Sequence, residues 1–213
     1  MSMQHPHEVK CPKCGTENSI LIHDSINVSL EPDNKAKVLD RSLFQFCCSK
    51  CGEVTGIEYC PLYHDMDEKY MIMVANDRKS AADAIIPDIG KNTNFSMFAD
   101  GYRFRVVYRI AGLIEKIKIF DNKLDDFAVE MLKLMLYGEL NQPAEIIFCD
   151  VNEKKISFWV YYEDSKNNKG ISVDRKYYDS AVQIVNDENI NKLKIQYVDM
   201  RIIAQALNEK EKR

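Results

Sequence analysis

The sequence predicts an α+β protein, and three observations support this. Two Cys-x-x-Cys pairs lie within the first 51 residues, apolar residues alternate over residues 19–31 between these pairs, and apolar spacing of three and four residues follows over 106–135. Shorter alternating segments return after residue 142. We expect an N-terminal zinc ribbon with an enlarged antiparallel β-sheet, an αα-hairpin, and a small C-terminal α/β unit, with domains at 1–141 and 142–213.

The two cysteine pairs are Cys11-Pro12-Lys13-Cys14 and Cys48-Ser49-Lys50-Cys51, and a glycine follows each pair. In a zinc knuckle the chain turns sharply so that backbone amides point at the sulfurs, and glycine accepts the backbone angles of that turn. The predicted ligands of a tetrahedral zinc ion are therefore Cys11, Cys14, Cys48 and Cys51. A shell of four thiolates leaves no open position, which favours structural zinc over catalytic zinc.

Other side chains offer alternatives to this ligand set. Cys47 gives poorer spacing with Cys51 than Cys48 does, so we expect it to be buried or held as a nearby thiol. A histidine such as His7, His23 or His64 would convert the site to a mixed, catalytic type. The simpler interpretation is that His5 and His7 lie in a flexible terminus and that His23 and His64 are surface or strand residues.

Hydropathy patterns predict the elements of the N-terminal part. Residues 19–31 alternate as a half-buried strand that bends near Asp24, and Asp33 is a candidate cap for a short helical turn. Residues 43–47 form a strand before the second knuckle, and residues 57–64 and 69–75 form a hairpin. Residues 76–101 give an irregular connection with a short helix near 81–84.

In the later segments the spacing of apolar residues changes twice, first to that of helices and then back to that of strands. Two apolar stripes, over 106–117 and 124–135, predict helices joined near Asn122, with the second ending at Gly138. Asp125 and Asp126 suit the positive N-terminal end of that second helix better than a pair of catalytic carboxylates. The C-terminal unit is predicted to contain strands at 144–149, 155–162, 171–173 and 194–198, a helix at 177–185, and a terminal helix capped by Asp199.

Composition fits a water-soluble protein with a substantial core. The 213 residues are 46% hydrophobic, no apolar run is long enough to span a membrane, and the N-terminus lacks the pattern of a signal peptide. Seven cysteines, an odd number with two tight pairs, suit metal binding in a reducing compartment better than disulfides. We therefore expect a cytoplasmic protein without membrane contact.

Charge argues against nucleic acid as a partner. Residues 1–75 contain 7 Lys and Arg against 11 Asp and Glu, and four thiolates around Zn²⁺ would add about two more negative charges. Nucleic-acid binding would be supported by a basic stripe on the folded surface, for which the candidates are Arg103, Arg105, Arg109, Lys116 and Lys118. These residues are more simply interpreted as the solvated face of a helix.

The chain resembles the CpXC family, named for a Cys-Pro-x-Cys motif near the N-terminus of bacterial and archaeal proteins. The motif here is Cys11-Pro12-Lys13-Cys14. The other matching segments are residues 24–28, 46–52, 62–65, 113–120 and 124–126, so the likeness covers roughly the first 140 residues. The resemblance supports the zinc site and implies no particular activity.

The sequence thus favours a zinc-stabilised binding or scaffold protein whose ligand is a protein or a small molecule. The alternative is an enzyme of the hydrolase type, with its site near His64 and Asp65 or at the junction of the two parts. Cys60, which lies shortly before His64, invites a Cys-His nucleophile interpretation, but such a cysteine is more often buried in a strand.

Overall fold

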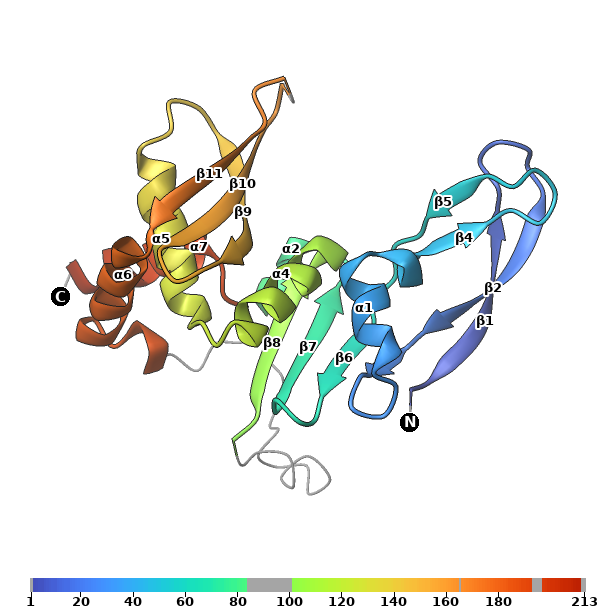
Figure 1. The fold of residues 1–213 in the computed structure, drawn as a ribbon, viewed down its shortest axis with the longest axis horizontal. Helices are drawn as coiled ribbons and strands as arrows, with labels where there is room; N and C mark the ends of the chain where they lie inside the picture. The colour runs from blue at the N-terminus through green and yellow to red at the C-terminus, as the bar shows by residue number, and fades with distance from the viewer. Residues whose placement is uncertain (1, 84–100, 165, 193–196, 212–213) are drawn as a thin grey trace. The chain divides into compact units, whose positions relative to one another are not determined.

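The computed structural model describes residues 2–83, 101–164, 166–192 and 197–211 (Figure 1). The chain divides into two compact units, Met1–Ile114 and Glu115–Arg213, and the division lies within helix α4 (Arg109–Asp121). This division falls earlier than the boundary expected after residue 141, which stays a prediction. The described residues confirm a mixed α+β protein with six α-helices and several small sheets.

Two short antiparallel hairpins carry the cysteine pairs (Figure 1). The first joins β1 (Gln4–Lys10) to β2 (Glu17–His23), and the second joins β4 (Gln45–Cys47) to β5 (Val54–Gly56). Each Cys-x-x-Cys pair occupies the turn of its hairpin, which is the strand-flanked arrangement that the sequence predicted. The flexible terminus expected around His5 and His7 was wrong, because both residues lie in β1 and pair with β2.

A four-stranded sheet follows in the order β3-β6-β7-β8. Its strands are β3 (Ser25–Asn27), β6 (Leu62–Asp65), β7 (Tyr70–Ala75) and β8 (Arg103–Tyr108). The predicted hairpin is confirmed as the antiparallel pair β6–β7, although its first strand begins at Leu62 and not at residue 57. The pairs β3–β6 and β7–β8 are parallel. The expectation of an enlarged antiparallel sheet was therefore wrong. The predicted bend is confirmed, since β2 ends and β3 begins on either side of Asp24.

Short helices connect these strands. They are α1 (Asp33–Leu39), the single-turn η1 (Ser42–Phe44) and α2 (Arg78–Asp83). Asp33 is the first residue of α1 and not its cap, because Pro32 occupies the cap position and makes no side-chain hydrogen bond. The helix predicted near 81–84 is thus present as α2, with residue 84 outside the described residues.

Strand β8 corrects a second prediction. Val106 and Val107 were assigned to a helix, but they lie in β8, where their side chains are buried. A strand covered on both faces has a continuous apolar run, which apolar spacing cannot distinguish from a helix. The helix starts instead at Arg109, whose φ is 66°. The prediction that the basic residues form a solvated helix face was also wrong, since Arg105 and Lys116 are buried.

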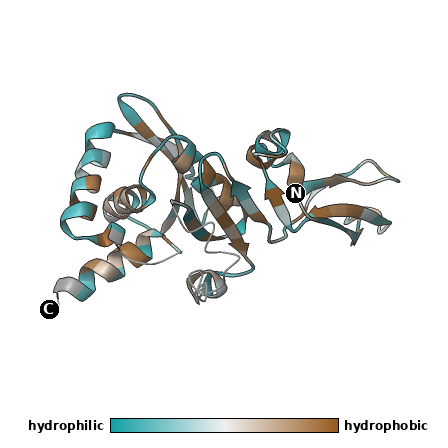
Figure 2. Ribbon diagram, turned by 90° about the horizontal axis from the view of Figure 1, so that it is seen from below, coloured by the Kyte–Doolittle hydropathy of each residue, from teal (hydrophilic) through white to brown (hydrophobic). Residues whose placement is uncertain are grey.

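The C-terminal unit combines a three-stranded antiparallel sheet with helices. The sheet order is β11-β10-β9, with β9 at Ala144–Val151, β10 at Lys155–Tyr162 and β11 at Lys169–Asp174. Helices α5 (Asp126–Gly138), α6 (Arg175–Asp187), α7 (Met200–Glu211) and the short η2 (Ile190–Lys192) complete the unit. Figure 2 shows hydrophilic and hydrophobic bands alternating along its helices, as expected for amphipathic elements.

Helix termini in this unit follow the sequence predictions. Asp125 caps α5 by accepting a hydrogen bond from the Ala128 amide, and Asp199 accepts one from the Ile202 amide at the start of α7. A four-residue turn joins α4 to α5, so the two predicted helices and their connection near Asn122 are present. Most of the strand predicted at 194–198 lies outside the described residues.

Candidate metal centre

The two knuckles have the same backbone hydrogen bonds. In the first, the Cys11 amide donates to the Thr16 carbonyl at 2.9 Å, and the Gly15 amide donates to the Cys11 carbonyl at 2.9 Å. In the second, the Cys48 amide donates to the Glu53 carbonyl at 2.8 Å, and the Gly52 amide donates to the Cys48 carbonyl at 3.0 Å. The turns are thus two copies of one local structure.

Each knuckle has a glycine at its left-handed position. Gly15 has a φ of 70° and Gly52 has a φ of 71°, in the left-handed region that other residues enter at a cost. This conformation follows the second cysteine directly and turns the backbone toward the sulfurs. The two glycines that the sequence placed after each pair therefore have a geometric function.

The hairpins bring the four thiols of Cys11, Cys14, Cys48 and Cys51 together, and we call this group the four-cysteine cluster. Their Sγ atoms all lie within 4.8 Å of one another. The Cys11–Cys51 and Cys14–Cys48 pairs are each 3.6 Å apart, and all four cysteines are free thiols. A tetrahedral zinc site with Zn–S bonds of about 2.3 Å has sulfurs about 3.8 Å apart. The cluster could therefore hold a metal ion.

Backbone amides and a hydroxyl adjust the acidity of these thiols. Hydrogen bonds from the amides of Cys51 and Lys50 lower the pKa of Cys48 to about 6. The Thr16 hydroxyl and amide lower the pKa of Cys14. The Glu53 amide also lowers the pKa of Cys51, but burial and the three neighbouring thiols outweigh it and raise that pKa to about 12.

The amide hydrogen bonds thus favour ionisation of Cys48, whereas burial and the neighbouring thiols oppose ionisation of Cys51. Without a cation, four sulfurs at such short distances cannot all carry negative charge. A bound divalent cation removes that conflict, because a coordinating thiol is deprotonated outright. The donor set fits a soft or borderline metal ion such as Zn²⁺.

Asn18 joins the two knuckles through its side-chain amide. Its Oδ1 accepts hydrogen bonds from the Ser49 amide at 2.9 Å and from the Ser49 hydroxyl at 3.0 Å. Its Nδ2 donates to the Thr16 carbonyl at 2.9 Å and to the Cys48 sulfur at 3.8 Å. Asn18 therefore holds the second knuckle against the first and touches a candidate ligand atom.

Asn18 was not among the residues predicted from the sequence, although a signal was available. Asn18 is a polar residue on the face of β2 that also carries Ile20 and Ile22, and its side chain is buried. A buried polar side chain on an otherwise apolar strand face needs hydrogen-bond partners, which here belong to the knuckles.

Little apolar packing supports the cluster. Cys11, Cys48 and Phe46 form its small buried core, with Val9, Cys14, Ile20 and Ile57 packed around it. Across the tips of the hairpins, Lys13 Nζ lies 2.9 Å from a Glu53 carboxylate oxygen, and this hydrogen bond raises the pKa of Lys13. Both side chains are largely exposed, so the pair contributes little stability.

The remaining thiols that the sequence singled out lie elsewhere. Cys47 is exposed and its Sγ donates to the Gly52 carbonyl at 3.6 Å, so burial of this residue was a wrong expectation. Cys60 is also exposed, with its Sγ 2.9 Å from the Asn76 Oδ1, and it lies outside any strand. The prediction of a buried strand cysteine at 60 was therefore wrong.

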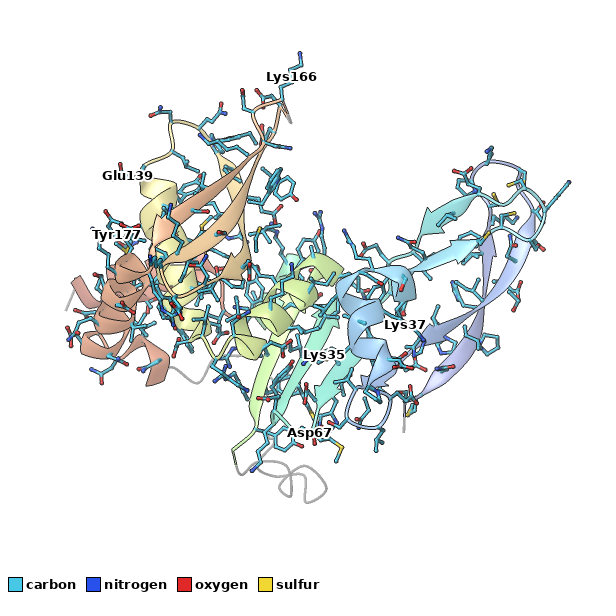
Figure 3. The ribbon with its side chains drawn as sticks, viewed as in Figure 1. Lys35, Lys37, Asp67, Glu139, Lys166 and Tyr177 are labelled. Carbon is cyan, nitrogen blue, oxygen red and sulfur yellow. The ribbon has the colours of Figure 1, made fainter. Side chains whose placement is uncertain are left out.

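His64 and Asp65 do not converge. They are neighbours on β6, so their side chains leave opposite faces of the strand. The Asp65 carboxylate is buried, lies 3.2 Å from the Lys35 ammonium, and accepts a hydrogen bond from the Glu68 amide. In Figure 3, Lys35 extends from α1 toward β6, whereas Lys37 lies on the other side of that helix.

His64 faces a different neighbour. Its Nε2 lies 3.2 Å from the Tyr102 hydroxyl, and burial lowers its pKa. Asp65 thus anchors α1 and the turn after β6, while His64 contacts an aromatic side chain. The two residues do not form the shared polar site that a hydrolase of the predicted kind would require.

A second group of charges is buried in the C-terminal unit, and we call it the ion chain. It consists of Asp126, Lys116, Glu130, Lys133 and Glu115 in that spatial order. Lys116 Nζ lies 3.2 Å from Asp126 and 3.3 Å from Glu130, and Lys133 Nζ lies 3.1 Å from Glu130 and also pairs with Glu115.

The backbone supports both ends of the ion chain, through a helix dipole at one end and an amide hydrogen bond at the other. Asp126 lies in the first turn of α5, where the helix dipole is positive, and Glu115 accepts the Phe148 amide from the edge strand β9. Burial raises the pKa of Glu130. Burial alone would lower the pKa of Lys133, but Glu115 and Glu130 outweigh it and raise that pKa.

Comparison with known proteins gives one positive result. The sequence model of the CpXC protein family matches residues 9–133, which is more than half of the chain. No curated protein and no solved structure matches the sequence. Among the described residues, no helix is long and apolar enough to cross a membrane. The matched segment contains both knuckles and all of the ion chain, and the chain therefore belongs to the CpXC family.

Proposed function

We propose that the four-cysteine cluster binds one Zn²⁺ as a structural ion and that the protein is a zinc-stabilised binding or scaffold protein. The convergence of four thiols at tetrahedral spacing is the observation that carries this proposal. Four sulfur ligands leave no position for a water or a substrate, so the ion would stabilise the fold and would not catalyse a reaction.

Zinc would supply stability that the ribbon cannot obtain from packing. The core between the hairpins has only three buried residues, two of which are themselves candidate ligands. Small domains with so little apolar burial depend on metals or disulfides. All seven cysteines are free, which favours metal binding in a reducing compartment such as the cytoplasm.

The partner of such a scaffold would be a protein or a small molecule. Nucleic acid remains disfavoured, because the ribbon region is acidic and a tetrathiolate zinc site makes it more so. In addition, two residues of the suspected basic stripe, Arg105 and Lys116, are buried and cannot contact phosphates.

Metal analysis of purified variants tests the proposal. The wild-type chain should contain one zinc per molecule, and Cys14→Ser and Cys48→Ser should each lose it and become sensitive to proteolysis within β1–β5. Cys47→Ser and Cys60→Ser are matched controls, because their thiols lie outside the cluster, and they should keep full stoichiometry. Retention of one zinc by Cys14→Ser would overturn the ligand assignment.

A further inference from the structure

Two histidines on β1 form a second group of metal-ligating side chains, outside the four-cysteine cluster. His5 and His7 are two residues apart in an extended strand, so both side chains leave the same face about 7 Å apart at the backbone. The β-register places His5 opposite Ile22 and His7 opposite Ile20, and both histidines are exposed. We call them the histidine pair.

Asp24 orients the first imidazole of the histidine pair. The His5 Nδ1 lies 2.8 Å from an Asp24 carboxylate oxygen. In a neutral imidazole, this contact places the ring proton on Nδ1 and leaves the Nε2 lone pair free. A carboxylate that holds a histidine in this way is the usual second layer of a protein metal site, where it fixes the ring and raises its basicity.

The surroundings of the histidine pair permit a cation. The other strand residues on this face of the hairpin are Val9, Asn18, Ile20 and Ile22, which carry no positive charge. Lys10 lies on the opposite face of β1. The His7 imidazole makes no hydrogen bond within the described part of the chain, so it can rotate toward its neighbour without losing an interaction.

We propose that His5 and His7 bind a second divalent ion of the zinc type, with Asp24 as the residue that orients His5. Imidazole nitrogen is a preferred ligand of Zn²⁺, and two imidazoles leave the other coordination positions to water. A site with two protein ligands at the surface exchanges its ion, in contrast to the closed four-cysteine cluster. This proposal does not depend on the structural role proposed for that cluster.

Zinc titration of the full-length chain, prepared without a histidine tag, tests the second site. The protein is first saturated with zinc and dialysed, and the tightly held equivalent is measured. Calorimetry should then detect one further equivalent of Zn²⁺. The ¹⁵N resonances of the His5 and His7 imidazoles should shift in proportion to its binding.

Three variants separate this site from nonspecific binding. His7→Ala should lower the affinity for the second Zn²⁺ by at least ~10-fold. Asp24→Asn should lower it by about 10-fold, because the His5 imidazole is no longer held in place. Glu8→Gln changes a side chain on the opposite face of the same strand and should leave the affinity unchanged. The tightly held first equivalent should persist in all three, which shows that the ribbon remains folded.

The proposal is overturned if the zinc-saturated protein takes up no second equivalent. It is also overturned if a second equivalent binds with the same affinity in His5→Ala and His7→Ala. A loss caused by Glu8→Gln as large as that caused by His7→Ala would likewise contradict it, because binding would then follow the charge of the strand and not the imidazoles.

Discussion

The four-cysteine cluster and the ion chain are two polar clusters that differ in how the charge of their acidic groups is offset. The cluster gathers four thiols with no opposing charge among them, so only an external cation would offset the charge of four thiolates. The ion chain alternates three carboxylates with two ammonium groups, and its ends lie at the N-terminus of α5 and at the Phe148 amide. One cluster therefore depends on solution conditions, and the other depends only on the chain.

Removal of metal should produce the largest difference between the two regions. A strong chelator should unfold the hairpins β1–β2 and β4–β5, whereas β9–β11 and α5–α7 should keep their structure, because their core contains no candidate metal ligand cluster among the described residues. Hydrogen exchange of backbone amides measures both regions in one sample. Equal loss of protection in both regions would contradict this contrast.

Breaking the ion chain should have the next largest effect. Lys133→Met keeps the volume of the side chain but leaves Glu115 and Glu130 without their shared ammonium group, which should lower the free energy of unfolding by about 3–5 kcal/mol. Chemical denaturation measures this change. The zinc content should stay at the wild-type value, since Lys133 lies in the unit that lacks the knuckles.

Glu130→Gln should lower the free energy of unfolding less than Lys133→Met does. Three carboxylates face two ammonium groups, and burial raises the pKa of Glu130, so the folded state already favours its neutral form. Because this pKa is raised, the group stabilises the fold most below its ordinary pKa of about 4.5, and that contribution is lost as pH rises through the folded value. Between about pH 4.5 and the folded pKa of Glu130, stability should therefore change less with pH in Glu130→Gln than in the wild type, and an unchanged profile would contradict the assignment.

Asn18→Ala should weaken the cluster without removing a ligand. It deletes the hydrogen bonds that join the two knuckles, and loss of an outer-shell partner typically costs about 10–100-fold in metal affinity. Competition with a chelator of known affinity measures the change. Asn34→Ala, at a comparably buried asparagine on α1, is the control and should leave the affinity unchanged.

Gly52→Ala should have the smallest effect of this series. The φ of 71° would cost a residue with a Cβ about 1–2 kcal/mol, although no atom blocks the added carbon within 4 Å. Zinc should still bind, with the ribbon unfolding at a lower denaturant concentration. Gly138→Ala, at the end of α5 and equally open, is the matched control without a positive φ and should not destabilise.

The sequence predicted the convergence of the four cysteines because its signal is local. Cysteine spacing and the glycine after each pair specify a knuckle almost independently of the rest of the fold. The strand β1 escaped notice, since Gln4–Lys10 is polar and becomes ordered only through its pairing with β2. Asn18 was not predicted for a related reason, because its role depends on contacts with the second knuckle, which is distant in the sequence.

The sheet and the ion chain depend on contacts between distant residues, which periodicity does not report. Val106 and Val107 fit both a helix and a buried strand, and the pairing of β8 with β7 decided between them. Lys116 was read as a solvated residue because lysine is rarely buried. Its burial requires Asp126 and Glu130 from the next helix, and no spacing rule indicates that they will meet.

X-ray absorption spectroscopy of the purified, metal-loaded protein tests the central claim most directly. A structural site formed by Cys11, Cys14, Cys48 and Cys51 predicts zinc bound by four sulfur atoms at about 2.3 Å, with no nitrogen or oxygen ligand in the tightly held equivalent. A first shell that contains a nitrogen or oxygen ligand, or a purified protein without bound metal, would contradict the account.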